Sequence, residues 1–346
     1  MMNIVTPFNA RQRDVIIASW LIVIMVMVFV MIVLGGVTRL THSGLSMVEW
    51  HPITGWLPPI GDTAWLEIFN KYKMFPEFQK INKNMDLSGF KSIFWLEYLH
   101  RLWGRLIGLA FLIPFIVFCA YGWVSRELAP KLILMFFLGG LQAVLGWYMV
   151  KSGLVNDVTV SHYRLSLHLT IAIIIISIIF WLLLNLKNKT NLKFFLVSKS
   201  NFPFLLLILL IYFQIILGAF VSGLDAGKIY QTWPLMGHTY LPNDLIFTDL
   251  KNLIDFENHS LIQFYHRNLA YLISFYIIIL SILIFIKNLK NLFKPLKILI
   301  FFFTLQVFLG IFTLVSGLNI YLALLHQINS LLLVFSTINL YYFSIK

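Results

Sequence analysis

Cysteine and charged side chains are both scarce in this sequence of 346 residues. The single cysteine, Cys119, excludes a disulfide framework, a CxxC redox motif and a thiolate metal site. Only 12% of the residues are charged, whereas 60% are hydrophobic. A soluble domain of this length needs far more polar surface, so the composition excludes a soluble globular protein.

The sequence contains several long apolar runs. Eight runs are long enough to cross a bilayer, at about 15–37, 97–121, 131–150, 162–186, 203–222, 260–286, 296–316 and 320–343. Each run predicts an α-helix, because a backbone in lipid must satisfy its own hydrogen bonds. We therefore predict an all-α integral membrane protein with eight transmembrane helices. The first run is too long for a signal-peptide core, and we interpret it as an uncleaved span.

The basic residues predict how these helices are oriented. The formal net charge is +12. One side of the predicted spans holds only the acids Asp14 and Glu127 but many basic residues: Arg11, Arg13, Arg126, Lys131, Lys187, Lys189, Lys193, Lys199, Lys287, Lys290, Lys294, Lys297 and Lys346. By the positive-inside rule this side is the cytoplasm, and it holds both termini. The basic charge therefore reflects the orientation of the protein in the membrane, and we expect no nucleic-acid partner. Two long loops, about 38–96 and 223–259, lie on the outer side, and loops of this length are usually functional.

An internal repeat relates the two halves of the chain. The windows LQAVLGWYMVKSGL, which starts at Leu141, and LQVFLGIFTLVSGL, which starts at Leu305, share seven of fourteen residues. The second and sixth runs also match, with LHRLWGRLIG in one and YHRNLAYLIS in the other. We predict two tandem four-helix bundles, residues 1–190 and 191–346, with the same orientation in the membrane. The repeated glycines would allow close approach of helices or of a flat ligand.

Four histidines lie inside predicted helices, one in each even-numbered span: His100, His168, His266 and His326. Each lies about two turns from the outer start of its span, so all four are expected at one depth. A single histidine would merely hydrogen-bond a neighbouring helix, but four at matched positions indicate a common cause. Paired axial ligation of one haem in each half fits best, because imidazole is a good iron ligand. The other five histidines fall in outer loops or at helix ends: His42, His51, His162, His238 and His259.

Arginines accompany these histidines. Arg101 follows His100, and Arg267 follows His266. Each is placed near the aqueous face where haem propionates would emerge, and arginine binds carboxylates in bidentate fashion. Further propionate candidates are Arg39 and Arg164. The alternative for each is an arginine that extends to the membrane interface.

The two halves differ at one acidic position. Glu97 lies three residues before His100 and shares a helix face with it, whereas the matching residue before His266 is Gln263. This difference predicts one reactive half and one half that carries a redox cofactor. The alternative is that Glu97 only complements the helix dipole.

The loop after the first span reads GGVTRLTHSGLSMVEWHPITGWLPP. With EYLHRLWGR and the LQxxLG repeats, the sequence resembles the haem A synthase family along nearly all of its length. In that family the enzyme oxidises the C8 methyl of haem O to a formyl group, which gives haem A for cytochrome c oxidase. Some members carry a cysteine pair in an outer loop. This chain has none, and so resembles the proteobacterial and mitochondrial type.

The resemblance implies roles for the site residues. His100 and His168 would hold the substrate haem O, His266 and His326 would ligate the iron of a permanent haem b, and Glu97 would be catalytic. Glu97 would either take a proton from the methyl or alcohol, or stabilise positive charge at that carbon. Either an axial histidine leaves the iron to admit oxygen, or electron removal is followed by attack of water.

The resemblance also implies a location and partners. It places the protein in a bacterial inner membrane, with the haem sites near the periplasmic side. Haem O synthase, cytochrome c oxidase assembly factors and further copies of the chain are the protein partners compatible with it.

Three other classes of protein stay open. A membrane di-haem b-type electron-transfer cytochrome predicts no substrate haem and little need for Glu97. A transporter predicts broken helices or charges at the membrane midplane. A haem-handling assembly factor would bind haem without reacting. The haem content of the purified protein distinguishes these classes.

Overall fold

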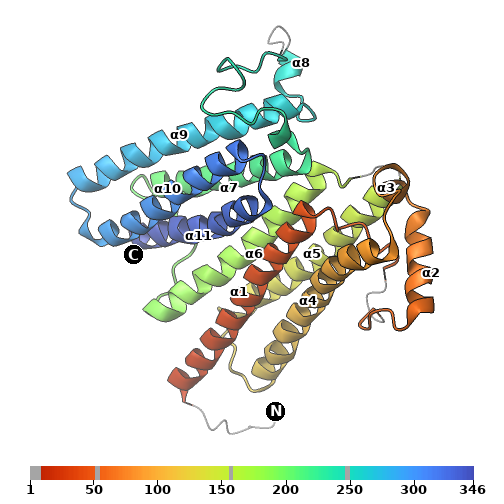
Figure 1. The fold of residues 1–346 in the computed structure, drawn as a ribbon. Coiled ribbons are helices and arrows are strands. Elements are labelled where there is room, and N and C mark those ends of the chain that lie inside the picture. The colour runs from red at the N-terminus through yellow and green to blue at the C-terminus, as the bar shows by residue number, and fades with distance from the viewer. Residues whose placement is uncertain (1–8, 51–54, 156–158, 246–249) are drawn as a thin grey trace. The chain divides into compact units, whose positions relative to one another are not determined.

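The computed structural model describes residues 9–50, 55–155, 159–245 and 250–346. Over these ranges the fold is all-α, and eight helices are long and apolar enough to cross a membrane (Figure 1). They are α1 (Ala10–Leu40), α4 (Leu87–Ala120), α5 (Ala129–Val155), α6 (His162–Asn188), α7 (Phe202–Gly223), α9 (His259–Ile286), α10 (Phe293–Val315) and α11 (Ile320–Ile345). The prediction of an all-α, multi-pass membrane protein is confirmed.

Short helices occupy the connections between these spans. Between α1 and α4 lie α2 (Asp62–Lys73) and α3 (Pro76–Lys80). Between α7 and α9 lie η1 (Ala226–Lys228) and α8 (Leu250–Leu253), and η2 (Lys290–Leu292) precedes α10. The two loops that were expected to be functional from their length are therefore partly helical.

The helix α4 begins at Leu87, well before the apolar run predicted near residue 97. Its first turn is capped by Asp86, whose side chain accepts a hydrogen bond from the Gly89 backbone N–H at 2.7 Å. The added turns are held by aromatic packing. Phe94 meets Trp65 of α2 at 5.0 Å between ring centroids, and Phe90 meets Phe69 at the same distance. Buried aromatic surface, and not hydropathy, therefore sets the start of this helix.

This extension changes the expected spacing of the histidines. In α6, α9 and α11 the histidine comes about two turns after the start, at His168, His266 and His326. In α4 the extra turns place His100 much further along the helix. The predicted spacing of about two turns between the start of the helix and its histidine therefore holds for His168, His266 and His326, but not for His100.

The chain divides into two compact units. Unit 1 contains Met1–Arg164 and Ile174–Ile179, and unit 2 contains Leu165–Ile173 and Phe180–Lys346. The helix α6 therefore contributes to both units. The boundary predicted from the repeat, between residues 190 and 191, stays a prediction.

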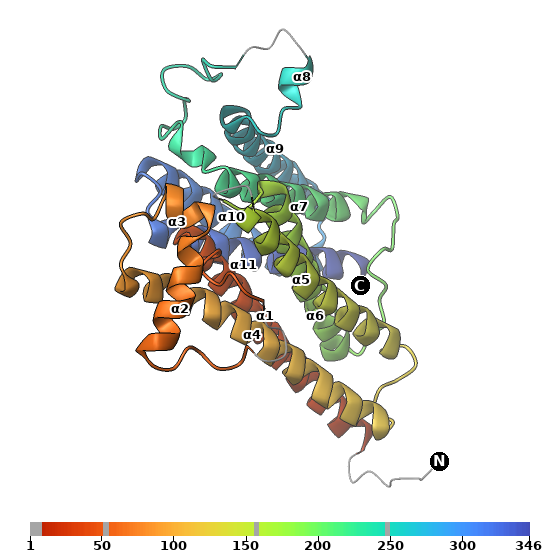
Figure 2. The same ribbon diagram turned by 90° about the vertical axis from the view of Figure 1, so that its right-hand side faces the viewer.

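In unit 1, α1 lies along α4 (Figures 1 and 2). Two indole groups join the helices by donating to backbone carbonyls. Trp103 Nε1 on α4 lies 2.8 Å from the Met27 carbonyl, and Trp20 Nε1 on α1 lies 2.9 Å from the Ala110 carbonyl. These bonds tie the apolar faces of α1 and α4 at defined levels.

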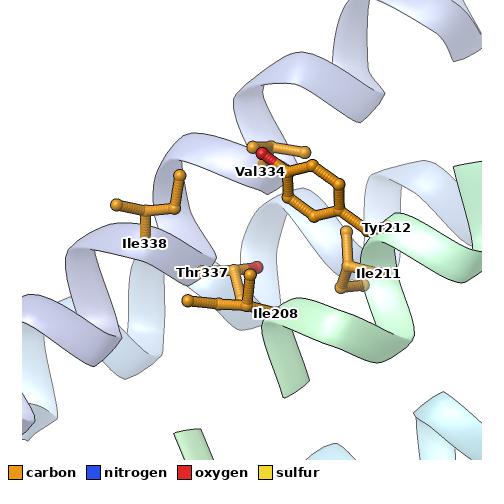
Figure 3. Close-up of a pocket in the computed structure, with 6 residues that line it drawn as sticks. All are labelled: Ile208, Ile211, Tyr212, Val334, Thr337 and Ile338. Atoms are coloured by element: carbon orange, nitrogen blue, oxygen red, sulfur yellow. The ribbon is translucent and has the colours of Figure 1, made fainter. Parts of the chain in front are cut away.

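In unit 2, α7 contacts both α9 and α11, and α10 contacts α11. The α7–α11 contact encloses a narrow hollow lined by Ile208, Ile211, Tyr212, Val334, Thr337 and Ile338 (Figure 3). Most of this lining is aliphatic, and the Thr337 hydroxyl donates to its own helix, to the Leu333 carbonyl at 2.8 Å. The hollow is a packing feature between two helices and brings no set of ligating side chains together.

Candidate haem-binding sites

Glu97 is buried on α4, with 3% of its surface exposed. Its Oε2 accepts hydrogen bonds from Ser46 Oγ at 2.7 Å and from the Met47 backbone N–H at 2.8 Å. Its Oε1 forms an ion pair with Arg101 Nη2 at 2.5 Å. All three partner groups donate, so the carboxyl oxygens of Glu97 accept from each of them.

Arg101 also holds the segment that follows α1. Its Nη2 donates to the Met47 carbonyl at 2.8 Å, and its Nη1 donates to the Glu49 carbonyl at 3.1 Å. Glu97 and Arg101 therefore bind the N–H and C=O groups of one short segment. This segment is part of the loop sequence on which the family resemblance rests.

The same positions in α9 bind the connection that follows α7. Gln263 Nε2 donates to the Tyr230 carbonyl at 2.8 Å. Arg267 donates from Nη2 to the Tyr230 carbonyl and from Nη1 to the Thr232 carbonyl, each at 2.9 Å. The repeat is thus visible in side-chain contacts. Glu97 and Gln263 each bind the loop that follows the preceding span, but only Glu97 is a carboxylate.

Three of the four helical histidines rest against a glycine on a neighbouring helix. A Cβ at Gly35 of α1 would lie 3.2 Å from His100 Cε1, and one at Gly218 of α7 would lie 3.1 Å from His266 Cε1. A Cβ at Gly310 of α10 would lie 2.9 Å from His326 Cε1. The imidazoles therefore occupy space that a larger residue would fill, which explains the glycine at each of these three positions.

A glutamine lies one turn before two of these glycines. Gln214 Nε2 donates to the His266 carbonyl at 2.9 Å, and Gln306 Nε2 donates to the His326 carbonyl at 3.1 Å. The Gln306 amide is oriented in turn by Asn329, whose Nδ2 donates to Gln306 Oε1 at 2.7 Å. The same offset of glutamine and glycine in α7 and α10 thus builds one histidine cradle twice.

Comparison with known proteins identifies the relatives of this chain. The model of a family described as cytochrome oxidase assembly protein matches residues 18–338. The chain is 44% identical over 321 residues to the haem A synthase of Pelagibacter ubique, covering 92% of this chain and 93% of that one. It is 42% identical over 333 residues to the haem A synthase of Paramagnetospirillum magneticum, covering 94% and 92%.

The chain belongs to the haem A synthase family. A third member, from Parvibaculum lavamentivorans, is 45% identical over 276 residues, covering 79% of this chain and 80% of that one. The matched region of the family model contains all the site residues named from the sequence.

The side chains of unit 2 fit the haem that the family implies. His266 and His326 are each half-buried. His266 Nδ1 is buried and makes no hydrogen bond among the described residues. Each ring lies against a glycine, where a Cβ would come within 3.1 Å of His266 Cε1 or 2.9 Å of His326 Cε1. Neutral imidazoles held in this way are suitable axial ligands for haem iron.

The predicted partner histidines of the first half fall in different units. His100 belongs to unit 1, whereas His168 lies in the Leu165–Ile173 stretch of α6 that belongs to unit 2. Their pairing around one haem stays a prediction. His51 lies outside the described residues.

The two remaining propionate candidates have protein partners of their own. Arg39 Nη1 lies 3.4 Å from His42 Nδ1. Arg164 donates to Ser152 Oγ and stacks over the Tyr148 ring at 4.8 Å from its centroid. Propionate binding by Arg39, Arg101, Arg164 and Arg267 stays a prediction.

Sequence reasoning missed one buried acid in unit 1. Glu77 of α3 is 5% exposed, and its Oε2 accepts a hydrogen bond from the Tyr72 hydroxyl at 2.9 Å. Asn82 Nδ2 donates in turn to the Tyr72 hydroxyl at 2.8 Å. Burial raises the pKa of Glu77 to about 7, although the Tyr72 hydrogen bond opposes that rise. The aromatic residues spaced along 65–78 are the signal that this segment folds into a buried cluster.

Proposed function

We propose that this protein is a haem A synthase, an oxidoreductase that converts the C8 methyl of haem O to a formyl group. The product, haem A, serves cytochrome c oxidase. Membership of the family supports this proposal, and so does one observation within the duplicated fold. A buried carboxylate, Glu97, accompanies His100, whereas the neutral Gln263 accompanies His266. Two equivalent electron-transfer sites would not need this difference.

Unit 2 carries the resident cofactor in this proposal. His266 and His326 ligate the iron of haem b, and Gly218 and Gly310 leave room for the imidazoles. When bound, this group supplies one-electron redox chemistry. The protein's contribution is to hold both histidines by their backbone carbonyls through Gln214 and Gln306.

The substrate, haem O, is held by His100 and His168. His100 stands one turn from Glu97 on α4, so the carboxylate and the ligand share a face of the helix. Loss of hydride or electrons from the methyl places positive charge on that carbon. A carboxylate in a buried site stabilises such charge strongly, and it also accepts protons released from the methyl or alcohol.

The arginines and the membrane orientation complete the proposal. Arg101 and Arg267 stand next to the ligand histidines and already bind loop carbonyls. Together with Arg39 and Arg164 they supply positive charge for the haem propionates. In this proposal both termini lie in the cytoplasm of a bacterial cell and the haem sites lie near the periplasmic side of its inner membrane; the positive-inside rule supports this orientation.

Haem analysis tests the proposal. The protein is purified from a host that makes haem O, and its haems are extracted and separated by chromatography. Haem b together with haem O or haem A is the expected result. Haem b alone, at two per chain, would instead establish an electron-transfer cytochrome, and a protein without haem would overturn both readings.

A further inference from the structure

A short stretch of the connection between α1 and α4, the WLPPI loop of residues 56–60, lies against the side of α4. The Tyr98 hydroxyl donates to the Trp56 carbonyl at 2.6 Å, and Arg105 Cζ lies over the Trp56 ring, 5.8 Å from its centroid. Tyr98 and Arg105 are seven residues apart, about two helical turns, so both face the same side of α4. The start of the loop is therefore held beside these two turns.

The pairing of α1 with α4 shows at what level of the fold the loop lies. Trp103 of α4 donates to the Met27 carbonyl of α1, and a second indole bond makes the two helices antiparallel with matched levels. Residues 98–105 of α4 therefore lie beside residues 25–32 of α1. That stretch of α1 reads MVMVFVMI and belongs to a helix apolar enough to cross a membrane. The WLPPI loop thus lies at the level of the hydrocarbon region, although it is part of a connection.

The chain leaves this level directly after the loop. At Gly61, where α2 begins, the backbone φ is +84°, a conformation that glycine adopts without strain. Along α2, Trp65 packs against Phe94 and Phe69 packs against Phe90, each at 5.0 Å between ring centroids. The helix α2 therefore runs toward the start of α4, and the WLPPI loop reaches deeper than α2 does.

The loop has the chemistry that this depth requires. Leu57 is 76% exposed and Ile60 is 77% exposed, so two aliphatic side chains project from the protein. A backbone in contact with lipid must leave few polar groups unsatisfied. Pro58 and Pro59 carry no N–H, and the Trp56 carbonyl is already bonded to α4. The loop therefore presents apolar side chains together with few backbone donors.

The exposed side chains of the loop adjoin the apolar surface of α4. Leu106 and Leu109 are exposed and lie next to Arg105, within one turn along α4. An arginine beside a tryptophan is also typical of the zone where a membrane protein meets lipid headgroups. The surface of the loop is thus continuous with the surface that α4 presents to lipid.

We propose that the WLPPI loop is re-entrant and inserts into the leaflet on the side where α1 ends, with Leu57 and Ile60 in contact with lipid acyl chains. The loop then fixes, from the lipid side, the turn of α4 in which Tyr98 follows Glu97. This inference concerns the membrane surface of the protein and does not depend on the proposed haem chemistry.

Spin-label accessibility tests the inference. In a Cys119→Ala background, Leu57→Cys and Ile60→Cys are labelled with a nitroxide one at a time and reconstituted into phosphatidylcholine vesicles. Collisions with oxygen, which concentrates in hydrocarbon, are compared with collisions with a neutral nickel chelate present on both sides of the membrane. The oxygen-to-nickel ratio at both positions is expected to exceed that of a label in water by roughly 10-fold, because a polar complex enters hydrocarbon at high cost.

Two further labels calibrate this ratio. Ile113→Cys lies in the membrane-spanning part of α4, where Ile113 is 57% exposed, and provides the value in lipid. Glu67→Cys lies on α2, where the Glu67 side chain is 68% exposed, and provides the value in water. The replaced side chains at all four labelled positions are exposed, so each variant should retain the packing of the fold. Thermal unfolding in detergent checks that each variant folds like the Cys119→Ala protein.

Two results would overturn the inference. A ratio at Leu57 and Ile60 equal to that at Glu67 would place the loop in water. A ratio close to that at Ile113 only in protein purified from a host that makes haem O would assign the surface to the substrate, and not to lipid. The haem content of the protein is measured separately, so a failure of the proposed function is distinguishable from either result.

Discussion

Glu97 Oε1 and Arg101 Nη2 form an ion pair at 2.5 Å, one helical turn apart on α4. Both side chains also bind the segment after α1, at Met47. The Glu97 carboxylate is buried and Arg101 is half-buried, so removing Arg101 leaves the carboxylate uncompensated in a low-dielectric site. Glu97 and Arg101 therefore both hold the loop, and the same Glu97 carboxylate has the proposed catalytic role.

Replacing Glu97 by glutamine separates these two tasks. Glu97→Gln keeps the size of the side chain but removes the negative charge, so haem A formation is expected to fall about 100-fold or more. Haem b content should be unchanged, because His266 and His326 are held by other residues. Chromatography of extracted haems measures both quantities.

Ser46→Ala is the matched control for Glu97→Gln. It removes one hydrogen bond to the same carboxylate and costs about 1 kcal/mol. Most haem A formation should therefore remain. If Ser46→Ala and Glu97→Gln lost activity equally, loop holding and not charge would be the role of Glu97.

The glycines behind the histidines predict a steric effect on haem b. A Cβ at Gly310 would lie 2.9 Å from His326 Cε1, so Gly310→Ala displaces the imidazole, and overpacking of this kind costs about 1–3 kcal/mol. The haem b content per chain, measured as the pyridine haemochrome, should decrease. Gly108→Ala on α4 is the control, since no described atom beyond the adjacent residues and the local helix backbone lies within 4 Å of the added carbon. Equal haem content in both variants would contradict the cradle.

Arg267 distinguishes loop binding from propionate binding. Arg267→Lys keeps the positive charge but loses the fork that reaches the Tyr230 and Thr232 carbonyls. If loop binding dominates, Arg267→Lys and Arg267→Gln should increase proteolysis of the connection after α7 to the same extent. If charge toward a propionate dominates, only Arg267→Gln should lower haem b affinity. Limited proteolysis and haem titration measure the two effects.

Glu77 predicts a stability that depends on pH. Its pKa is about 7 in the folded protein against an ordinary value of 4.5, because burial disfavours the carboxylate. The folded state therefore binds more protons than the unfolded state between these values. Stability is highest below the ordinary pKa and decreases as pH rises toward 7, by about 3 kcal/mol in total.

Glu77→Gln should remove this pH dependence and make the protein more stable than wild type at about pH 8. Thermal unfolding in detergent, followed by tryptophan fluorescence at about pH 5 and about pH 8, measures the difference. The control is Glu67→Gln on α2, whose side chain is 68% exposed and which should retain the wild-type pH dependence. A wild-type protein with the same stability at both pH values would show that Glu77 titrates normally.

Hydropathy was sufficient to place the eight spans, because the bilayer requires long apolar helices whatever their neighbours are. The repeat and the spacing of His100 and Glu97 were also readable, because helical periodicity decides which residues share a face. Local chemistry thus predicted the class of fold and the candidate ligands His266 and His326.

Contacts between distant segments were not readable in this way. The start of α4 at Leu87 depends on aromatic packing with α2, which no hydropathy window contains. The bonds from Gln214 to the His266 carbonyl and from the Met47 N–H to Glu97 join residues 52 and 50 positions apart. Such bonds depend on which helices become neighbours, so the tertiary structure alone shows that Gln214 and Gln306 hold the backbone of His266 and His326.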